Sequence, residues 1–295
     1  KQTRQEMAGA DKIHAWLATC SKEAQWSAVA YAINCFIVQT SMFGWYGETN
    51  SVMSKRYQTF VTPAGWAFSI WGYIFMSQAV FTVWSVLPQT TSSHHCSRAH
   101  SATVVKAIWV PWIAAQAFQV VWTFIFAQDM VLLSFVAMGG IYLSLAGVVY
   151  KLRTIERQTN VFALAPATWV LCHLPFLVHF GWISCASLIN VNVVIRSRNL
   201  ELEVQLAAAT ITLAFVIVSC LVAILLRREA THCFVVGWAL YALNSQLMRP
   251  DNPLPFDAAG KPFTTGLAMA SLFLSFTAVA GGVASAAWGF WERRG

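Results

Sequence analysis

The chain has 295 residues, of which 57% are hydrophobic and only 11% are charged, and its formal net charge is +7. Soluble domains contain about 25% charged residues, so this composition excludes a mainly water-facing surface and indicates a membrane protein. The Lys and Arg residues are scattered over short connections, which disfavours a nucleic-acid partner.

Apolar runs follow one another along the chain, most of them close to the roughly 20 residues that a helix needs to cross a bilayer. They predict an all-α, polytopic transmembrane helix bundle rather than a barrel, because they are continuous and do not alternate. Seven spans are an alternative to eight, since 27–46 carries Asn34 and Gln39 and 230–247 is short. The eight expected spans are 27–46, 65–87, 106–127, 130–151, 166–194, 204–226, 230–247 and 264–290.

These spans suggest three parts of the chain. An N-terminal surface segment covers 1–26, a transmembrane helical domain covers 27–247, and a Pro-rich loop with a C-terminal transmembrane helix covers 248–295. With eight spans, thirteen Lys and Arg residues fall on the side of the N-terminus and six on the opposite side. The positive-inside rule therefore puts both termini on the cytoplasmic, stromal or matrix side.

All twelve Asp and Glu residues lie outside the expected spans or at their ends, so we expect no buried carboxylate. This disfavours a proton-driven transporter, which usually holds such groups at membrane depth. The sequence also lacks Gly-x-Ser-x-Gly, His-Glu-x-x-His and phosphate-binding loop motifs, and we expect a protein that is not an enzyme.

A histidine-containing loop and the last span each allow two interpretations. The loop at 88–103 contains His94, His95, Cys96 and His100, but it lacks the spacing of a tetrahedral metal site, so an exposed polar loop is favoured. The last span is rich in Gly, Ala and Ser, which allows close helix packing. Its packing partner is either this chain or another membrane subunit.

Three motifs centred on tryptophan stand in a fixed order. Residues 62–72 read Thr-Pro-Ala-Gly-Trp-Ala-Phe-Ser-Ile-Trp-Gly, residues 119–126 begin Gln-Val-Val-Trp, and residues 174–190 run from Leu-Pro-Phe through Trp-Ile-Ser to an Asn. This order resembles the tryptophan-rich sensory protein and translocator protein (TspO/MBR-like) family, particularly its longer members. Gln119 stands where the family has Asn. Shorter members are five-helix bundles, so the spans after residue 203 extend that plan.

The resemblance implies a cavity inside the bundle for a planar hydrophobic ligand, namely a tetrapyrrole (haem, porphyrin or chlorophyll), a sterol or a lipid-like molecule. Indole rings stack on such ligands, and a few amides fix their orientation. The expected ligand-binding residues are Trp66, Trp71, Trp122, Trp182, Gln119 and Asn190. Tryptophans at span ends also form interfacial belts, to which we assign Trp109, Trp112, Trp288 and Trp291.

Two histidines in the fifth span, His173 and His179, are candidate pigment ligands through a neutral imidazole nitrogen, although hydrogen bonds to other helices are favoured. The main expectation is a non-catalytic receptor or carrier. One alternative is an accessory scaffold subunit of a large organellar complex, photosynthetic or respiratory, that binds pigments or lipids on its surface. A transporter is the third. Thylakoid and mitochondrial membranes are the expected locations.

Overall fold

The computed structural model describes residues 20–86, 98–158, 166–227, 229–249 and 261–291, and within them all regular structure is helical. The all-α prediction is therefore confirmed for this part of the chain. The elements are α2 (Lys22–Ser41), α3 (Asn50–Arg56), the 3₁₀ turn η1 (Gly65–Ser69), α4 (Ile70–Val86), α5 (Arg98–Ala127), α6 (Val131–Gln158), α7 (Pro166–Cys172), α8 (Leu174–Ser197), α9 (Leu202–Val222), the π-helical turn η2 (Ala223–Arg227), α10 (Ala230–Leu247) and α12 (Lys261–Trp291).

Six of the described helices are long and apolar enough to cross a membrane. They correspond to six of the eight expected spans. The other two, 27–46 and 230–247, overlap α2 and α10, which are not among these six. Helix α2 begins at Lys22, so the expected boundary at residue 26 falls inside a helix. Of the expected loop at 88–103 with its metal-binding alternative, residues 88–97 lie outside the described residues, as do the segments 1–19 and 250–260.

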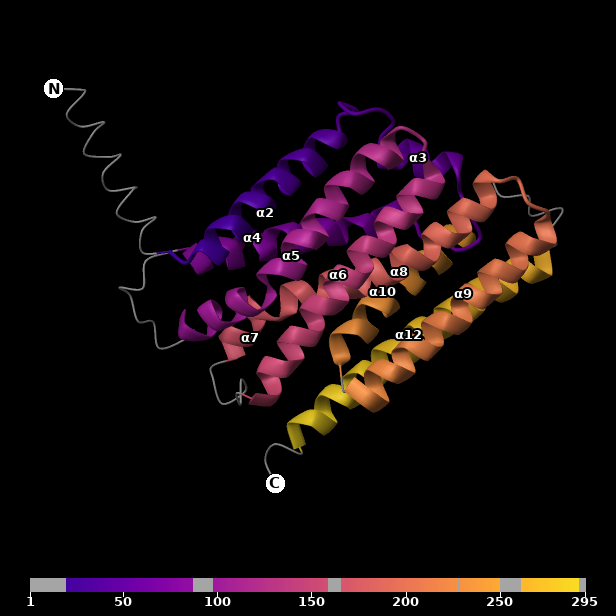
Figure 1. Ribbon diagram of the computed structural model, residues 1–295. Coiled ribbons are helices and arrows are strands. Elements are labelled where there is room, and N and C mark those ends of the chain that lie inside the picture. Colours follow the sequence, from indigo (N-terminus) through magenta and orange to yellow (C-terminus); the bar gives the residue numbers. More distant parts are fainter. Residues whose placement is uncertain (1–19, 87–97, 159–165, 228, 250–260, 292–295) are drawn as a thin grey trace.

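The long helices run up and down the bundle, and the start of α2 and the end of α12 lie toward the same end (Figure 1). Helix α5 packs along α6 and α2, whereas α8 lies against α6 and α10. We call α2, α4, α5, α6 and α8 the five-helix part. Helices α9, α10 and α12 form the C-terminal extension, in which α10 and α12 pack side by side.

Close packing inside the extension uses glycine. A Cβ atom on Gly237 would lie 2.7 Å from Val279 Cγ2, and one on Gly282 would lie 3.2 Å from Cys233 Cβ. A Cβ on Gly281 would lie 2.5 Å from Ile224 Cδ1. The small residues of the last span therefore pack against α10 and η2 of the same chain.

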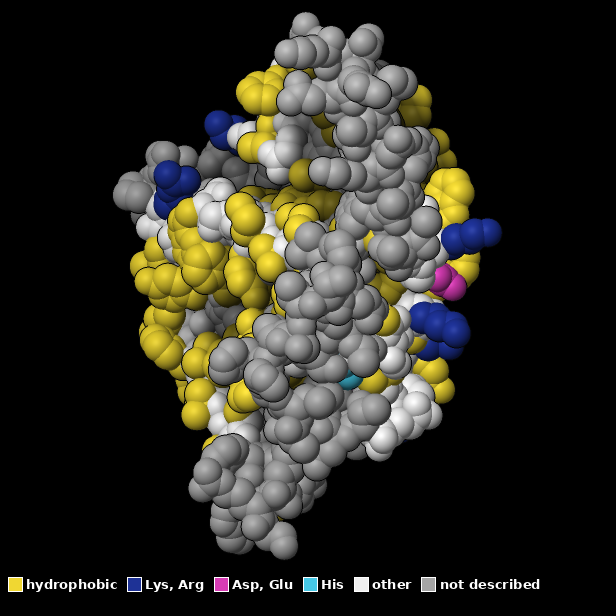
Figure 2. Space-filling model, turned by 90° about the vertical axis from the view of Figure 1, so that its left-hand side faces the viewer, with side chains coloured by type: hydrophobic (Ala, Val, Ile, Leu, Met, Phe, Trp, Pro, Cys, Tyr) yellow, Lys and Arg dark blue, Asp and Glu magenta, His cyan; other side chains and the backbone are white. Residues whose placement is uncertain are grey.

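The outer surface is strongly apolar. Large hydrophobic side chains are exposed on most long helices, and Phe273 on α12 is 67% exposed. Figure 2 shows broad areas of hydrophobic side chains on one face, with few Lys and Arg side chains between them. Such a surface suits a hydrocarbon environment, and the chain is an integral membrane protein.

Two expectations about exposure are wrong. Trp112 was expected at an interface, but it lies on the inner face of α5 and packs against Phe81 and Phe176 with ring centroids 5.6 and 5.2 Å away. His100 was expected in an exposed loop. Helix α5 begins at Arg98, so His100 falls in its first turn, where it is buried.

The expectation of no buried carboxylate is also wrong. Helix α6 extends to Gln158 and carries Glu156 into the protein, where its side chain is only 10% exposed, and Glu229 before α10 is buried. Both carboxylates are bonded to the Arg153 guanidinium, with N–O distances of 2.6 and 2.7 Å. This pairing offsets part of the desolvation cost that would otherwise keep the carboxylates at the surface.

Candidate functional site

The expected ligand-binding tryptophans do not line one shared cavity. Trp182 is 1% exposed and meets Phe68 edge to face, with ring centroids 5.6 Å apart. Trp66 is 39% exposed and packs against Trp238 of α10, with centroids 4.7 Å apart. These two tryptophans therefore contribute to packing between the five-helix part and the extension.

Trp71 and Trp122 lie nearer the middle of the five-helix part. Trp71 is half-buried, borders three of the hydrophobic clusters, and meets the His179 ring with centroids 5.5 Å apart. Trp122 stacks on Phe126, with centroids 4.8 Å apart. Both tryptophans pack against the cluster that contains Phe180 and Ile183 of α8. The structure thus brings these two expected residues to one region.

An amide cluster joins α2 to α5. The side-chain amide of Asn34 donates to the Oε1 atoms of Gln116 and, at 3.3 Å, of Gln119. Asn34 and Gln116 are both buried, and among the described residues Asn34 Oδ1 and Gln116 Nε2 have no hydrogen-bond partner. Gln119 was expected as a polar contact, whereas Asn34 and Gln116 were not. The signal for Asn34 was present, since a polar amide in an apolar run is costly unless it has a partner.

Further unpaired polar atoms lie on α5 and α8. Within the described residues, the buried Nε1 of Trp122 and Oδ1 of Asn190 have no partner. Asn190 lies on the face of α8 that carries Ala186 and Val193, whose clusters also contact Trp122. Because an unpaired buried polar atom costs about 1–3 kcal/mol, the pair on Trp122 and Asn190 marks this part of α5 and α8 as a candidate binding site.

The two candidate pigment-ligand histidines have different surroundings. His179 Nδ1 lies 3.0 Å from Gln78 Nε2 on α4, and its Nε2 has no partner in the described part of the chain. His173 lies at the break between α7 and α8. Its Nδ1 is 3.1 Å from Glu156 Oε1, and its Nε2 is 2.9 Å from His100 Nε2. Both histidines thus have hydrogen-bond partners on other helices, and pigment ligation stays a prediction.

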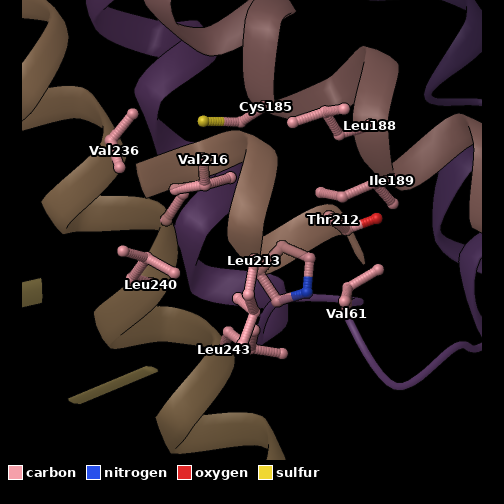
Figure 3. Close-up of a pocket in the computed structure, with 12 residues that line it drawn as sticks. Val61, Cys185, Leu188, Ile189, Thr212, Leu213, Val216, Val236, Leu240 and Leu243 are labelled. Atoms are coloured by element: carbon pink, nitrogen blue, oxygen red, sulfur yellow. The ribbon is translucent and has the colours of Figure 1, made fainter. Parts of the chain in front are cut away.

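Hollows in the described structure lie away from the tryptophans. One has a volume of about 30 Å³ and lies between α8, α9 and α10, lined by apolar side chains with Thr212 and Cys185 (Figure 3). Another, of about 300 Å³, is open and lies where Tyr57, Asp129 and Arg198 meet. Neither is lined by the four tryptophans. Pockets for drug-sized ligands measure about 300–1,000 Å³, so a ligand at Trp71 and Trp122 requires side chains to move.

Fold and interior together define a polytopic helical membrane protein with a polar and aromatic interior. A family model described as TSPO-like protein matches residues 24–279. The chain therefore belongs to the TSPO-like protein family, and the resemblance seen in its motifs is confirmed. No match was found among curated proteins or among solved structures.

Proposed function

We propose that this protein is a non-catalytic membrane receptor or carrier that binds a planar hydrophobic ligand inside the five-helix part. The ligand classes are a tetrapyrrole, a sterol and a lipid-like molecule. The observation that carries the proposal is that buried polar atoms of Asn34, Gln116, Trp122 and Asn190, all within the five-helix part, have no hydrogen-bond partner among the described residues. A mainly apolar ligand with one or two polar groups would give these atoms partners.

The aromatic rings and the polar atoms of this region have separate roles in ligand binding. The rings of Trp71 and Trp122 supply apolar contact area, and the indole N–H of Trp122 donates a hydrogen bond. The free carbonyl oxygen of Asn190 accepts one. Because neither of the two hollows is lined by these tryptophans, the ligand enters by displacing side chains, and we expect association slower than diffusion.

The test is a titration with protoporphyrin IX and, separately, with cholesterol, followed by quenching of tryptophan fluorescence for the first and by competition for the second. The Trp122→Phe variant keeps a ring and removes the N–H donor, and we expect its affinity to fall about fivefold or more, as one hydrogen bond is worth about 1 kcal/mol. Trp66→Phe is the matched control and should bind as the wild type does. Equal affinities for all three proteins would refute the site.

A second candidate function is an accessory subunit of a large organellar membrane complex, in a thylakoid or mitochondrial membrane. It is favoured by one face of α12, where Met269, Phe273 and Phe276 are each about two-thirds exposed. Pigments, lipids or other subunits would cover this face. Size exclusion after gentle extraction, with visible absorption recorded, separates the functions: a receptor elutes as a small particle, and a subunit elutes only within a large one.

A further inference from the structure

An open hollow lies at the end of the bundle where α5 ends and α6 begins. Its volume is about 300 Å³, which is the lower end of the range for small-molecule sites. Its apolar lining comes from residues 130–133 at the start of α6, and its polar lining consists of Tyr57, Asp129, Ser197 and Arg198. None of the described tryptophans lines it, so it is a different place from the proposed ligand-binding region inside the five-helix part.

The hollow lies where two membrane-spanning helices end. Helix α6 begins at Val131, α8 ends at Ser197, and both helices are candidate spans. Both of these terminal residues line the hollow. The headgroups of a bilayer lie just outside its hydrocarbon core, which is about 30 Å thick, so the ends of spanning helices lie at their depth. The hollow is therefore at the level of the lipid headgroups.

The two charged residues that line the hollow have opposite signs. Asp129 Oδ2 accepts a hydrogen bond from Arg56 Nη1 at 3.0 Å, and Arg56 also pairs with Glu48. Two carboxylates share one guanidinium here, so this group keeps a net negative charge. The Arg198 guanidinium has no ion-pair or hydrogen-bond partner in the described part of the chain. A hollow lined by both charges is complementary to a ligand that also carries both.

The two hydroxyl groups that line the hollow act as acceptors toward a ligand. Tyr57 is hydrogen-bonded to the Asp129 carboxylate, and a carboxylate only accepts, so the phenol is the donor. Ser197 Oγ donates to the Val194 carbonyl at 2.8 Å. Each hydroxyl has thus used its hydrogen and keeps lone pairs. With the carboxylate they offer three acceptor groups, which match the three N–H donors of a primary ammonium group.

Exposed apolar positions continue from the hollow along α6. Leu132 lines the hollow and is exposed, as are Val136 and Leu143, which the helical repeat places on the same face. Gly139 falls on this face between them, and a Cβ added there would meet no atom within 4 Å. The stripe is therefore open to an acyl chain whose headgroup lies in the hollow.

We propose that the hollow binds the headgroup of a zwitterionic phospholipid with a primary ammonium group, as in phosphatidylethanolamine, and that the acyl chains lie along α6. Arg198 binds the phosphate through charge-assisted hydrogen bonds. Asp129, Tyr57 and Ser197 accept hydrogen bonds from the ammonium group. Phosphatidylcholine has no N–H donor for these three acceptors, and phosphatidylglycerol places a net negative charge beside Asp129. Both should bind more weakly.

The test is native mass spectrometry of the purified protein in detergent, titrated with phosphatidylethanolamine, phosphatidylcholine and phosphatidylglycerol that have the same acyl chains. We expect phosphatidylethanolamine to bind about tenfold more tightly than the other two. Equal affinities, or tighter binding of either other lipid, would overturn the proposal. Soluble phosphoethanolamine separates a lipid from a free phosphate ester: it should compete only in large excess, and competition at equal concentration would overturn the assignment to a lipid.

Two variants with a matched control locate the binding. Arg198→Gln removes the cation and should weaken all three lipids about tenfold. Arg196→Gln removes the same charge from the last turn of α8, at a residue that does not line the hollow, and should bind as the wild type does. Equal losses in both would mean general charge attraction and would contradict the site.

The carboxylate is tested separately. Asp129→Asn removes the negative charge, so it should weaken phosphatidylethanolamine without weakening phosphatidylglycerol, and the preference between these lipids should disappear. A preference that stays unchanged in this variant would refute the role of Asp129. Because the variant also loses an ion pair with Arg56, thermal unfolding checks that it is folded. If it is not, the lipid preference of the wild type and the arginine variants still decide.

Discussion

In the five-helix part, several buried side chains leave a polar atom without a partner, as at Asn34, Gln116, Trp122 and Asn190. In the C-terminal extension most buried polar groups of the described residues are paired: Ser275 donates to the Gly237 carbonyl at 2.8 Å, and Asn244 donates to the Ala268 carbonyl at 2.8 Å. Paired groups stabilise a helix contact, whereas unpaired groups cost stability unless a ligand completes them. The difference separates a region with several unpaired buried polar atoms from a region held by paired contacts.

The largest expected effect is at the joint, by which we mean the packing interface between the five-helix part and the C-terminal extension. Trp182→Ala removes a buried ring from the cluster shared by α8, α9, α10 and α12 and should cost about 3–5 kcal/mol of folding stability. Trp66→Ala, at a part-exposed ring, should cost less. Thermal unfolding in detergent measures both. Equal losses would mean that the joint is not packed as described.

Substitution of glycine by alanine tests the packing within the extension. Gly237→Ala places a Cβ 2.7 Å from Val279 and 3.3 Å from the Ser275 carbonyl, and should cost about 1–3 kcal/mol. Gly266→Ala is the control on α12, where a Cβ would meet no atom within 4 Å, so helix propensity should make that variant slightly more stable. Stabilisation by both changes would refute the close approach of α10 and α12.

Two asparagines on α8 differ in hydrogen bonding, so their variants test the comparison directly. Asn192 donates to Thr212 Oγ1 at 2.8 Å, so Asn192→Leu should cost about 1 kcal/mol. Asn190→Leu removes the unpaired oxygen, so it should leave stability unchanged or raised while weakening protoporphyrin binding. Unfolding and fluorescence titrations of the same samples measure both properties. A stability loss at Asn190 without a binding loss would make it a packing residue.

The smallest effect concerns an exposed cluster at the end of the bundle where α5 ends and α6 begins. A hydrogen bond from Tyr57 to Asp129 raises the pKa of the phenol above its ordinary value of 10.0. Asp129→Asn removes the charge, so Tyr57 should ionise at lower pH, which a difference titration of phenolate absorbance records. Glu48→Gln changes the neighbouring partner of Arg56 and serves as the control. An unchanged titration in Asp129→Asn would show that the contact is not kept in solution.

Much of this fold could be predicted from the sequence, because span length and apolarity depend on local composition. The expected span 230–247 coincides with α10, and the motif order identified the family. The break at His173 within 166–194 was missed, although Pro175 in the first turn of α8 is a local signal for it.

The candidate site was predicted less well. Trp122 and Asn190 were expected and lie in the region with unpaired atoms, but Asn34 and Gln116 were not expected. A single sequence shows that a polar residue lies in a span, but it does not show which residue faces it. The burial of Glu229 depends on Arg153, which lies far away in the sequence, so local composition gave no sign of it.

Helix α10 has a consequence for how the protein is made. It is not among the six helices apolar enough to cross a membrane by composition, yet it lies between α8 and α12, and most of its side chains are buried by them. A segment of marginal apolarity partitions poorly from the translocation channel into lipid by itself. We therefore expect α10 and α12 to enter the bilayer as a hairpin, because a chain that ends after residue 249 lacks the α12 contacts that bury α10.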